Sequence, residues 1–401
     1  MRLILFTGKG GVGKTTIAAG TAALAAARGL KTLVLSTDAA HSLADALGVE
    51  VGVVGKDAAA GGPTELDAGL FVHQVDAQRR FEQSWQEIQG YLMSVLSAAG
   101  VDAIEAAELT VLPGAEEVLA LLEVRDQVRA GRWDLVVVDC APTAETLRLL
   151  ALPDALGWYM DRIFPFERRV VRSLRPVLGR VAGVPMPRDR VFDAVERLHS
   201  ELREVREVLS GPQASVRLVL TPESVVVAEA RRTLTSLSLY GYRVDGVVAN
   251  RVFPSGGDAW RQGWVAAQDA QLVEVDASFA PLPVLRTPYR PGEPVGQDAL
   301  RELAEQTYGD VDPCATPTVA DPVQVDRSGE EFVLSLALPL ATRDAVDLAR
   351  VADDLVVTVG SHRRVLALPS ALRRCTVAGA ALRDGRLRVR FEPDPDQWRT
   401  L

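Results

Sequence analysis

Lysine is nearly absent from this chain of 401 residues, which has four lysines against 40 arginines. Two of the four, Lys9 and Lys14, lie in one short glycine-rich segment. Arginine therefore serves almost everywhere else that a cation is needed. A compact ammonium and a planar guanidinium are not interchangeable where a site fixes its own geometry. The two lysines thus mark residues 8–16 as the first candidate site.

Cysteine is also scarce, and its spacing excludes two kinds of site. Cys140, Cys314 and Cys375 are far apart in the sequence and form no C-x-x-C pair. A zinc site on paired thiolates and a disulfide framework are therefore not predicted, and a reducing compartment fits. No apolar run of about 18 residues occurs, so no membrane-spanning helix is predicted. The first predicted strand begins at Arg2 and leaves no room for a signal peptide, so we expect a cytoplasmic protein.

Positive charge is in the minority overall. The formal net charge is −9, and an acidic balance argues against a nucleic-acid-binding surface. Hydrophobic residues make up 48% of the chain, which is enough for buried cores. A length of 401 residues predicts two or three domains.

The segment that holds the two lysines has the form of a phosphate-binding loop. It reads Gly8-Lys9-Gly10-Gly11-Val12-Gly13-Lys14-Thr15-Thr16, between an apolar run at 3–6 and an alanine-rich helical stretch at 17–27. This is the context in which G-x-x-x-x-G-K-[ST] holds a nucleoside triphosphate. Glycines let backbone N–H groups face phosphate oxygens, and the helix N-terminus adds positive partial charge. We expect Lys14 to contact the β- and γ-phosphates and Thr15 to bind Mg²⁺.

Apolar runs that end in polar residues alternate with helical stretches. The runs lie at 32–36, 70–75, 135–138, 216–220, 244–249 and 283–285. This alternation predicts an α/β fold with a mostly parallel sheet and helices on both faces. Ligands of such sheets bind at the carboxyl ends of the strands, so the polar residues there are candidates. The glycine-containing segment 56–69 is predicted as a loose surface loop.

Three polar residues at predicted strand ends suit nucleotide chemistry. Asp38 can position an attacking water or bind Mg²⁺ through water, and it also suits the N-cap of the helix that follows. Asp139 follows four apolar residues, an arrangement that holds Mg²⁺ in P-loop proteins. Asn250 carries a donor and an acceptor that suit an adenine edge, although Asn is also a common turn residue after a strand.

Two regions break the alternation. Apolar residues follow helical spacing at 81–95 and 191–209, with a further apolar stretch at 158–177. Such stripes are either packed core or an exposed groove for an apolar client. We expect an inserted helical subdomain at about 77–130 and 150–210.

The C-terminal part has a different pattern. The segment 311–322 contains three prolines and little periodicity, which predicts a linker. Short alternating runs follow at 332–336, 355–359, 365–368 and 387–391, with turn signals such as Asp384-Gly385. These features predict a small all-β sandwich at 323–395.

Together these motifs closely resemble the family of the arsenite-pump ATPase ArsA and the ATPases that target tail-anchored membrane proteins. Lys9 with the following Gly-Gly-Val-Gly-Lys-Thr-Thr is similar to the deviant Walker A motif of dimeric nucleotide-switch ATPases, in which the additional lysine reaches the partner's nucleotide. Segments 38–43 and 139–150 resemble the two switch regions. Asn250 matches the family's adenine-contacting Asn, and Pro288 and Tyr289 lie near the place of its adenine loop. The resemblance covers residues 1–310, the expected ATPase domain.

The chain also departs from this family. Ala39 stands where the family usually has Pro, and Ala144-Glu145 where it has Gly-His. The C-x-x-C that bridges the dimer of the targeting ATPases is absent, so zinc is not expected, and the arsenite-binding cysteines have no counterparts. Strings at 354–360, 365–369 and 384–389 resemble the α-crystallin domain of small heat-shock proteins.

The resemblance implies a homodimeric ATPase with ATP and Mg²⁺ at each site, without nucleic acid or an integral membrane span. Lys9, Lys14 and Asp38 would be catalytic, while Thr15, Asp38 and Asp139 would hold Mg²⁺, the acids through water. ATP binding and hydrolysis would be coupled to capture and release of a hydrophobic protein client. The alternatives are a subunit of an arsenite or metalloid pump, a Min- or Par-like positioning ATPase, and a non-catalytic nucleotide-dependent scaffold.

Overall fold

The structure, a computed structural model, describes residues 1–37, 42–49, 62–74, 115–140, 189–316, 319–329 and 331–398. The chain divides into two compact units. The first comprises Met1–Gln74, Ala130–Arg148 and Leu209–Leu401, and the second comprises Val75–Arg129 and Leu149–Val208. Asp38, the second switch region from residue 141 onward, and most of the expected helical subdomain lie outside the described residues.

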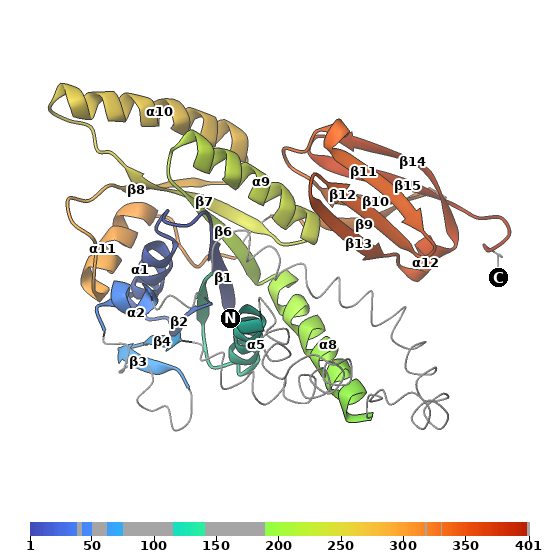
Figure 1. Cartoon of the computed structure of the whole chain (residues 1–401), viewed down its shortest axis with the longest axis horizontal. Coiled ribbons are helices and arrows are strands. Elements are labelled where there is room, and N and C mark those ends of the chain that lie inside the picture. Colours follow the sequence, from blue (N-terminus) through green and yellow to red (C-terminus); the bar gives the residue numbers. More distant parts are fainter. Residues whose placement is uncertain are drawn as a thin grey trace, which may run out of the picture. The chain divides into compact units, whose positions relative to one another are not determined.

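An eight-stranded sheet runs through the first unit (Figure 1). Its strand order is β3-β4-β2-β5-β1-β6-β7-β8, and every pairing is parallel except that of β3 with β4. In chain order the strands are β1 Arg2–Thr7, β2 Thr32–Ser36, β3 Thr64–Asp67, β4 Leu70–Gln74, β5 Leu135–Asp139, β6 Ala214–Leu220, β7 Val244–Val252 and β8 Val284–Pro288. The predicted α/β fold with a mostly parallel sheet is confirmed.

The central strands are buried along their whole length. Every residue of β1, β2, β5 and β6 is buried, which explains why these strands read as nearly continuous apolar runs. The parallel register places the carboxyl ends of neighbouring strands together. The Thr37 backbone N–H donates to the Asp139 carbonyl at 2.9 Å, and the Cys140 N–H donates to the Phe6 carbonyl at 3.0 Å. The chain exits of β1, β2 and β5 therefore meet at one edge.

One sequence expectation about this sheet is wrong. The sequence predicts a loose loop at 56–69, but Thr64–Asp67 forms the edge strand β3, antiparallel to β4. Its burial alternates between half-buried and exposed residues, because only one face of this edge strand is covered. This strand contains polar residues and is followed by a turn at Gly69, with a φ of 83°. A search for apolar runs therefore does not detect it.

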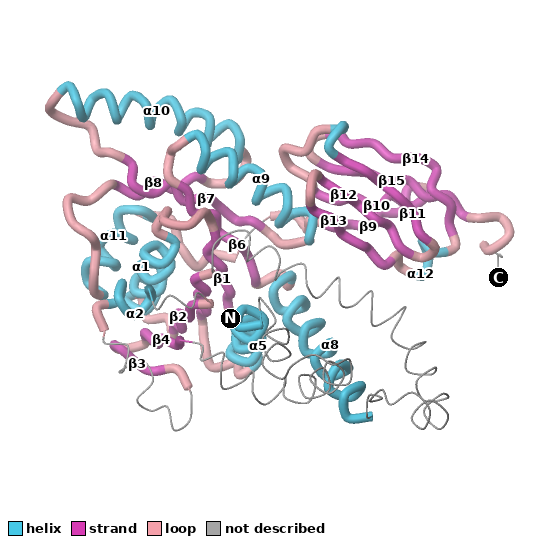
Figure 2. The backbone as a smooth tube through the Cα atoms, viewed as in Figure 1, coloured by secondary structure: helices cyan, strands magenta, loops and turns pink. Residues whose placement is uncertain are grey.

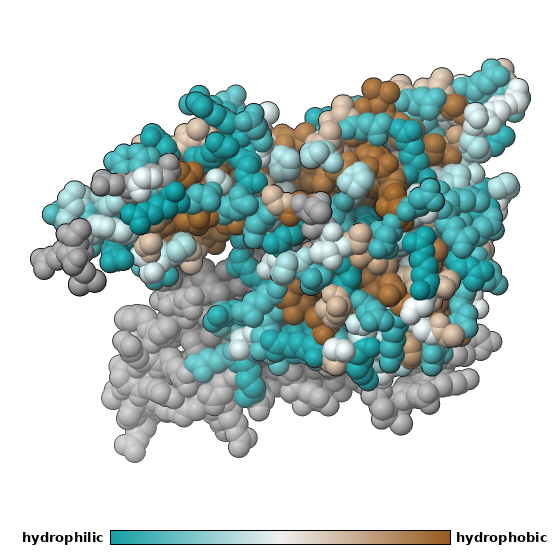
Figure 3. Space-filling model, turned by 180° about the vertical axis from the view of Figure 1, so that it is seen from behind, coloured by the Kyte–Doolittle hydropathy of each residue, from teal (hydrophilic) through white to brown (hydrophobic). Residues whose placement is uncertain are grey.

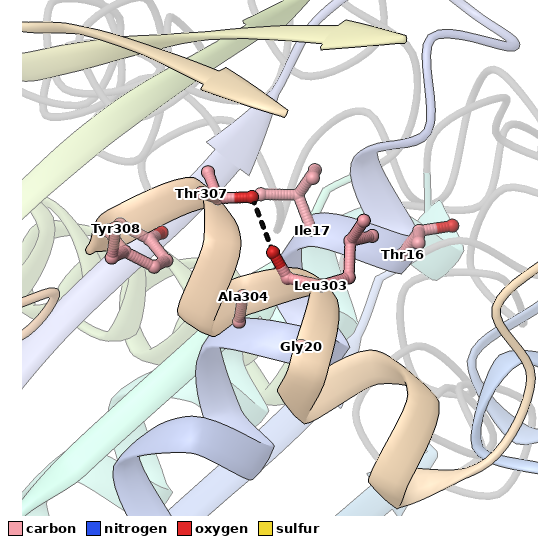
Figure 4. A pocket seen from close by; sticks show the side chains of 7 residues that line it. All are labelled: Thr16, Ile17, Gly20, Leu303, Ala304, Thr307 and Tyr308. Atoms are coloured by element: carbon pink, nitrogen blue, oxygen red, sulfur yellow. Dashed lines mark hydrogen bonds between the residues drawn. The ribbon is translucent and has the colours of Figure 1, made fainter. Parts of the chain in front are cut away.

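Five described helices accompany the sheet in the first unit. They are α1 Lys14–Ala27, α2 Ser42–Leu47, α9 Ser224–Tyr240, α10 Ala259–Phe279 and α11 Gln297–Tyr308. Helices α1 and α11 lie side by side (Figure 4), with Gly20 facing Leu303, Ala304 and Tyr308. A side chain at Gly20 would begin 2.8 Å from the Leu300 carbonyl oxygen. The seam between the two helices is too narrow to hold a water molecule, so it is a packing contact.

The described part of the second unit consists mainly of two helices. These are α5 Ala115–Arg129 and α8 Asp189–Ser210, whose last two residues belong to the first unit. Arg125 and Arg129 of α5 both pair with Glu204 of α8, at 3.2 and 2.7 Å. Leu202 and Val205 of the predicted apolar stripe are buried, so this part of the stripe is packed core.

The C-terminal residues form two small antiparallel sheets (Figure 2). One sheet has the order β14-β15-β10-β9 and the other the order β11-β12-β13. The elements are β9 Val323–Ser328, β10 Glu331–Ala337, a 3₁₀ turn η1 Arg343–Ala345, β11 Val346–Val351, β12 Asp354–Val359, β13 His362–Ala367, α12 Ser370–Arg373, β14 Cys375–Arg383 and β15 Arg386–Pro393. Alternate residues such as Leu334, Val357 and Phe391 form its core. The small all-β part predicted from alternation is confirmed, and its seven strands are referred to below as the sandwich.

The segment that precedes the sandwich is bonded to the main sheet. The guanidinium of Arg2 donates to the Ala315 carbonyl at 3.3 Å, and that of Arg217 donates to the Pro313 carbonyl at 3.2 Å. Both arginines also pair with Asp245, at 2.9 and 2.7 Å. Two buried guanidinium groups share one carboxylate, and the two carbonyls accept further N–H bonds. The described part of the expected linker is therefore held against the amino-terminal side of the sheet.

Candidate functional site

The loop after β1 wraps the N-terminus of α1. Gly13 has a φ of 90°, in the left-handed region, and a side chain on it would collide with the amide of Asn250. A side chain on Gly8 would collide with the Val219 carbonyl oxygen. These two positions admit only glycine, because backbone conformation and close approach both forbid a Cβ. The loop thus places backbone N–H groups and the positive end of α1 together, as a phosphate site requires.

The two loop lysines differ in their surroundings. Lys14, the first residue of α1, is 7% exposed, and its Nζ donates to the Lys9 carbonyl at 3.3 Å. The Lys9 side chain is 39% exposed, and its Nζ lies 3.8 Å from a carboxylate oxygen of Glu229. Lys14 is therefore directed along its own loop, whereas the Lys9 side chain extends to α9.

Oxygen ligands for a hard cation gather beside the loop. The Thr15 hydroxyl donates to Asp139 Oδ2 at 2.7 Å and lies 3.3 Å from the hydroxyl of Ser42. Asp139 is 1% exposed at the end of β5. Two hydroxyls and a carboxylate fit Mg²⁺, which takes oxygen ligands. The structure thus brings together Thr15 and Asp139, both singled out from the sequence.

Ser42 is a residue that sequence reasoning missed. It is the first residue of α2, and only the fold brings its hydroxyl to Thr15. Its position shortly after Asp38, in the segment that resembles a switch region, is the signal that could have found it. Asp38 itself lies outside the described residues, which stop at Thr37 on this side of the site.

Cys140 follows Asp139 but does not offer a thiolate. Burial raises the pKa of its thiol well above the usual range, and the neighbouring Asp139 carboxylate raises the pKa further. The residue is 3% exposed, in accord with a small buried side chain. Among the residues that the structure describes, no group of three or more His, Cys, Asp or Glu side chains is placed to hold a metal.

Asn250 joins β7 to the phosphate loop. Its Nδ2 donates to the Val12 carbonyl at 2.8 Å, and its Oδ1 accepts the N–H of Arg251 at 2.9 Å. The residue is 5% exposed. Its amide keeps one further N–H and one further lone pair. The hydrogen bond from Asn250 to Val12 also supports the loop, a role that the sequence did not indicate.

Pro288 and Tyr289 lie beside the end of β7. The Tyr289 N–H donates to the Val252 carbonyl at 2.8 Å, and Val252 pairs with Pro288 across the strands. The Tyr289 ring stacks on Phe253, with centroids 5.0 Å apart, and remains 45% exposed. This exposed aromatic face is suited to stacking on a base. Phe253, which orients the tyrosine, was not singled out from the sequence.

The comparisons with known proteins agree with this geometry. Residues 1–309 match the ArsA ATPase family, described as anion-transporting ATPase. The chain belongs to the ArsA ATPase family. Residues 329–391 match the HSP20-like domain found in ArsA, which corresponds to the α-crystallin-like part of the sandwich. As a member of this family, the protein is an ATPase.

Three relatives illustrate the range of similarity to this ArsA-family protein. An uncharacterised Streptomyces coelicolor protein is 42% identical over 99% of both chains. A putative arsenical pump-driving ATPase of Chlorobaculum tepidum is 34% identical over 98% of this chain and 96% of its own. The ATPase get3 of Schizosaccharomyces pombe is 25% identical over 79% of this chain and 93% of its own. Among the described helices of this ATPase, none is long and apolar enough to cross a membrane.

Proposed function

We propose that this ATPase is a homodimeric switch, in which ATP binding and hydrolysis drive the binding and release of a hydrophobic protein client. The observation that carries the proposal is the contrast between its two loop lysines. Lys14 is buried along its own loop, while the Lys9 ammonium extends from the same loop and stays accessible. One ammonium thus serves the nucleotide of its own subunit, and the other is available to the nucleotide of a second subunit.

The proposed chemistry at each site is positioning and charge neutralisation. Thr15 and Ser42 would hold Mg²⁺ through their hydroxyls, with Asp139 acting through water, and the cation would neutralise charge on the phosphates. The backbone N–H groups of the loop and the Lys14 ammonium would fix the β- and γ-phosphates. Asp38 would orient the attacking water in line with the γ-phosphate.

The proposed base site lies on the other side of the loop. Asn250 would bind the adenine edge through its remaining N–H and lone pair, and Pro288 and Tyr289 would cover the ring. Support comes from the distance of 2.8 Å that ties Asn250 to the loop residue Val12, and from the exposed Tyr289 ring at the neighbouring strand end. Base and phosphate sites are thereby linked through a single side chain.

A partner-binding role is supported by the surface. Hydrophobic residues lie at the surface in several places (Figure 3). On α10, Trp260 and Trp264 pack against each other at 6.0 Å and remain 69% and 47% exposed. Large exposed aromatic pairs are characteristic of surfaces that bind proteins.

A metalloid-pump role is the second candidate, because several relatives carry the name arsenical pump-driving ATPase. Such a role needs soft thiolate ligands close together. Cys140, directly after β5, and Cys375, in the sandwich, are both buried, and Cys314 belongs to the segment that precedes the sandwich. Stimulation of ATP turnover by arsenite would favour the pump role over the client role.

The switch is tested by combining turnover with self-association. Lys14→Ala should lose nucleotide binding, and Asp38→Asn should bind ATP but lose most of its hydrolysis. Lys9→Ala should still bind nucleotide, but its subunits should not associate with each other when ATP is present. Arg232→Ala, which removes an exposed cation from α9, is the control for loss of charge. Sedimentation with a non-hydrolysable ATP analogue measures the association. If Lys9→Ala dimerises like the control, the proposed role of Lys9 is wrong.

A client can be identified with the Asp38→Asn variant. A hydrolysis-blocked switch should retain a bound hydrophobic protein in the presence of ATP and release it when ATP is removed. Retention that does not depend on ATP, or that is unchanged in Lys14→Ala, would contradict the coupling of nucleotide and client.

A further inference from the structure

Helix α9 connects the phosphate loop to the sandwich within the first unit. It runs for 17 residues, from Ser224 to Tyr240, between strands β6 and β7 of the main sheet. Figure 1 shows its C-terminal end directed toward the sandwich. Its i→i−4 hydrogen bonds link successive turns from one end of the helix to the other.

At its N-terminal half, α9 contacts the loop lysine. Glu229 lies 3.8 Å from Lys9 Nζ, and its side chain is 30% exposed. The strand that leads into α9 also touches the loop, because Val219 packs against Gly8. Glu229 therefore offers Lys9 a carboxylate inside its own subunit, and this contact must break if Lys9 binds elsewhere.

At its C-terminal end, α9 is held by the sandwich through three kinds of contact. Leu239 is fully buried in the sandwich core. The Thr235 hydroxyl donates to the Pro339 carbonyl at 2.6 Å. The Arg364 guanidinium of β13 donates to the Leu239 carbonyl at the end of the helix. The last turn of α9 has no basic residue of its own, so Arg364 supplies the cation that a helix C-terminus favours.

We propose that α9 is the element through which the sandwich controls the phosphate loop. Glu229 acts as a positioning residue that holds the Lys9 side chain in its own subunit, and the sandwich fixes the helix that carries Glu229. The consequence for ATP-dependent association rests on the proposed function of Lys9. The contact between Glu229 and Lys9, and its dependence on the sandwich, do not rest on it.

The first experiment measures how readily the Lys9 amine reacts. The nucleotide-free, full-length protein is treated with an amine-reactive reagent, and modification at Lys9 is followed by peptide mass spectrometry. Glu229→Gln should raise the rate about 1.5- to 5-fold, the range expected for loss of a half-exposed ion pair. Glu223→Gln, an exposed glutamate just before the same helix, should leave the rate unchanged. Equal rates in Glu229→Gln and the wild type would overturn the proposal.

The second experiment perturbs the sandwich end of α9. Thr235→Val removes the bond to Pro339 with little change in volume, and Arg364→Lys keeps the charge but loses the guanidinium geometry. Hydrogen exchange should rise in the last turns of α9, and the Lys9 reaction rate should rise with it. In the double variant Thr235→Val with Glu229→Gln, the Thr235 effect should disappear if the sandwich acts through Glu229. Faster exchange in α9 with an unchanged Lys9 rate would refute the coupling.

A third measurement separates this inference from the proposed dimer. If Lys9 crosses to a partner, Glu229→Gln should lower the ATP concentration for half-maximal association by a similar 1.5- to 5-fold. Failure of the wild type to associate would contradict the dimeric switch, while the Lys9 reaction rates would still decide the role of Glu229. If the Lys9 reaction rate is unchanged in Glu229→Gln and the wild type associates normally, the proposed control of the phosphate loop through α9 is refuted. The dimeric switch would then still stand.

Discussion

Single residues at the loop show how a rare residue type marks a site. Lys9 and Lys14 are five positions apart, yet Lys14 is buried along the loop and Lys9 reaches Glu229. Thr15 and Asp139, 124 positions apart, are bonded at 2.7 Å. The types of these residues were evident from the sequence, because each chemistry has few candidate side chains. The contacts between these residues were not evident from the sequence, because separation along the chain says nothing about distance in the folded protein.

Ser42→Ala tests the cation site. The Ser42 hydroxyl lies 3.3 Å from that of Thr15, so its loss removes one oxygen from the proposed Mg²⁺ shell. We expect the Mg²⁺ concentration for half-maximal ATP turnover to rise roughly 10- to 100-fold, in the range seen when supporting partners of a metal site are removed. Ser224→Ala, an exposed serine at the start of α9, serves as the control. An unchanged Mg²⁺ dependence would exclude Ser42 from the shell.

The thiols offer a pH-dependent test at the same scale. Burial, and then the nearby Asp312 carboxylate, raise the pKa of Cys314 to about 11. At pH 8 roughly one thousandth of this thiol is ionised, since each pH unit below the pKa lowers the thiolate fraction tenfold. Alkylation of Cys314 in the native protein should therefore be slow at pH 8 and rise about tenfold by pH 9. A rate that is flat across this interval would contradict the raised pKa.

At the scale of elements, close helix packing depends on a residue without a side chain. Helix α1 is rich in alanine, and Gly20 lets α11 approach until the Leu300 carbonyl oxygen lies only 2.8 Å from the position that a Cβ would take. Thr307 of α11 donates to the Leu303 carbonyl at 2.8 Å and lies 2.9 Å from Thr287 of β8, which fixes α11 on the sheet. The first helix after the loop is thus braced along its length.

Gly20→Ala should destabilise the protein despite the higher helix propensity of alanine. The added methyl group meets a backbone oxygen at 2.8 Å, and overpacking of this kind costs about 1–3 kcal/mol. The propensity gain of about 1 kcal/mol offsets only part of that cost. Gly263→Ala in α10, where nothing lies within 4 Å, is the matched control and should be neutral or stabilising. The thermal unfolding midpoints of the two variants and the wild type are compared. If Gly20→Ala is as stable as the wild type, α11 can move away from α1 to make room for the methyl group.

Elements with strong patterns were predictable, and elements with weak patterns were not. The buried strands β1, β2 and β5 have apolar residues at all their inner positions, and α8 has a clear helical stripe. Strands β9, β11 and β14 of the sandwich were missed, as was β3. Six of the nine residues of β14 are exposed, and it is built mainly from small residues, so no alternation marks it. Such strands are fixed by pairing with neighbours, which acts across the sequence.

At the scale of the whole first unit, the sandwich is joined to the ATPase part at two places. Arg2 and Arg217 bind carbonyls of the preceding segment, and α9 enters the sandwich core through Leu239. The prolines of that segment predicted a linker, but its composition could not reveal that buried arginines 96 and 313 positions away would hold it. The ATPase part and the sandwich are therefore joined by specific side-chain contacts.

The α9–sandwich contact should weaken in mild acid. His362 packs edge-on against Tyr240, and burial lowers the pKa of the His362 side chain below its usual value of 6.5. Between the lowered pKa and 6.5 the unfolded chain binds more protons than the folded chain, so stability increases with pH in this window and is lost as the pH falls. His362→Phe keeps the ring contact and removes the titration.

Urea unfolding at pH 7.5 and pH 5.5 provides the measurement. The drop in the urea midpoint between these pH values should be smaller in His362→Phe than in the wild type. The same drop in both proteins would show that His362 does not contribute to the acid sensitivity.

The kind of protein could be inferred from local sequence patterns. A phosphate loop with two lysines, the acid that ends β5 and the alternating strands of the C-terminal part are local patterns, and local backbone geometry enforces each of them. The contacts of these residues follow only from the folded chain. The parallel register brings Thr15 to Asp139 and Ser42, and the course of α9 brings Glu229 to Lys9. Such contacts join segments far apart in the chain, and they arise from packing and strand pairing that no local pattern encodes.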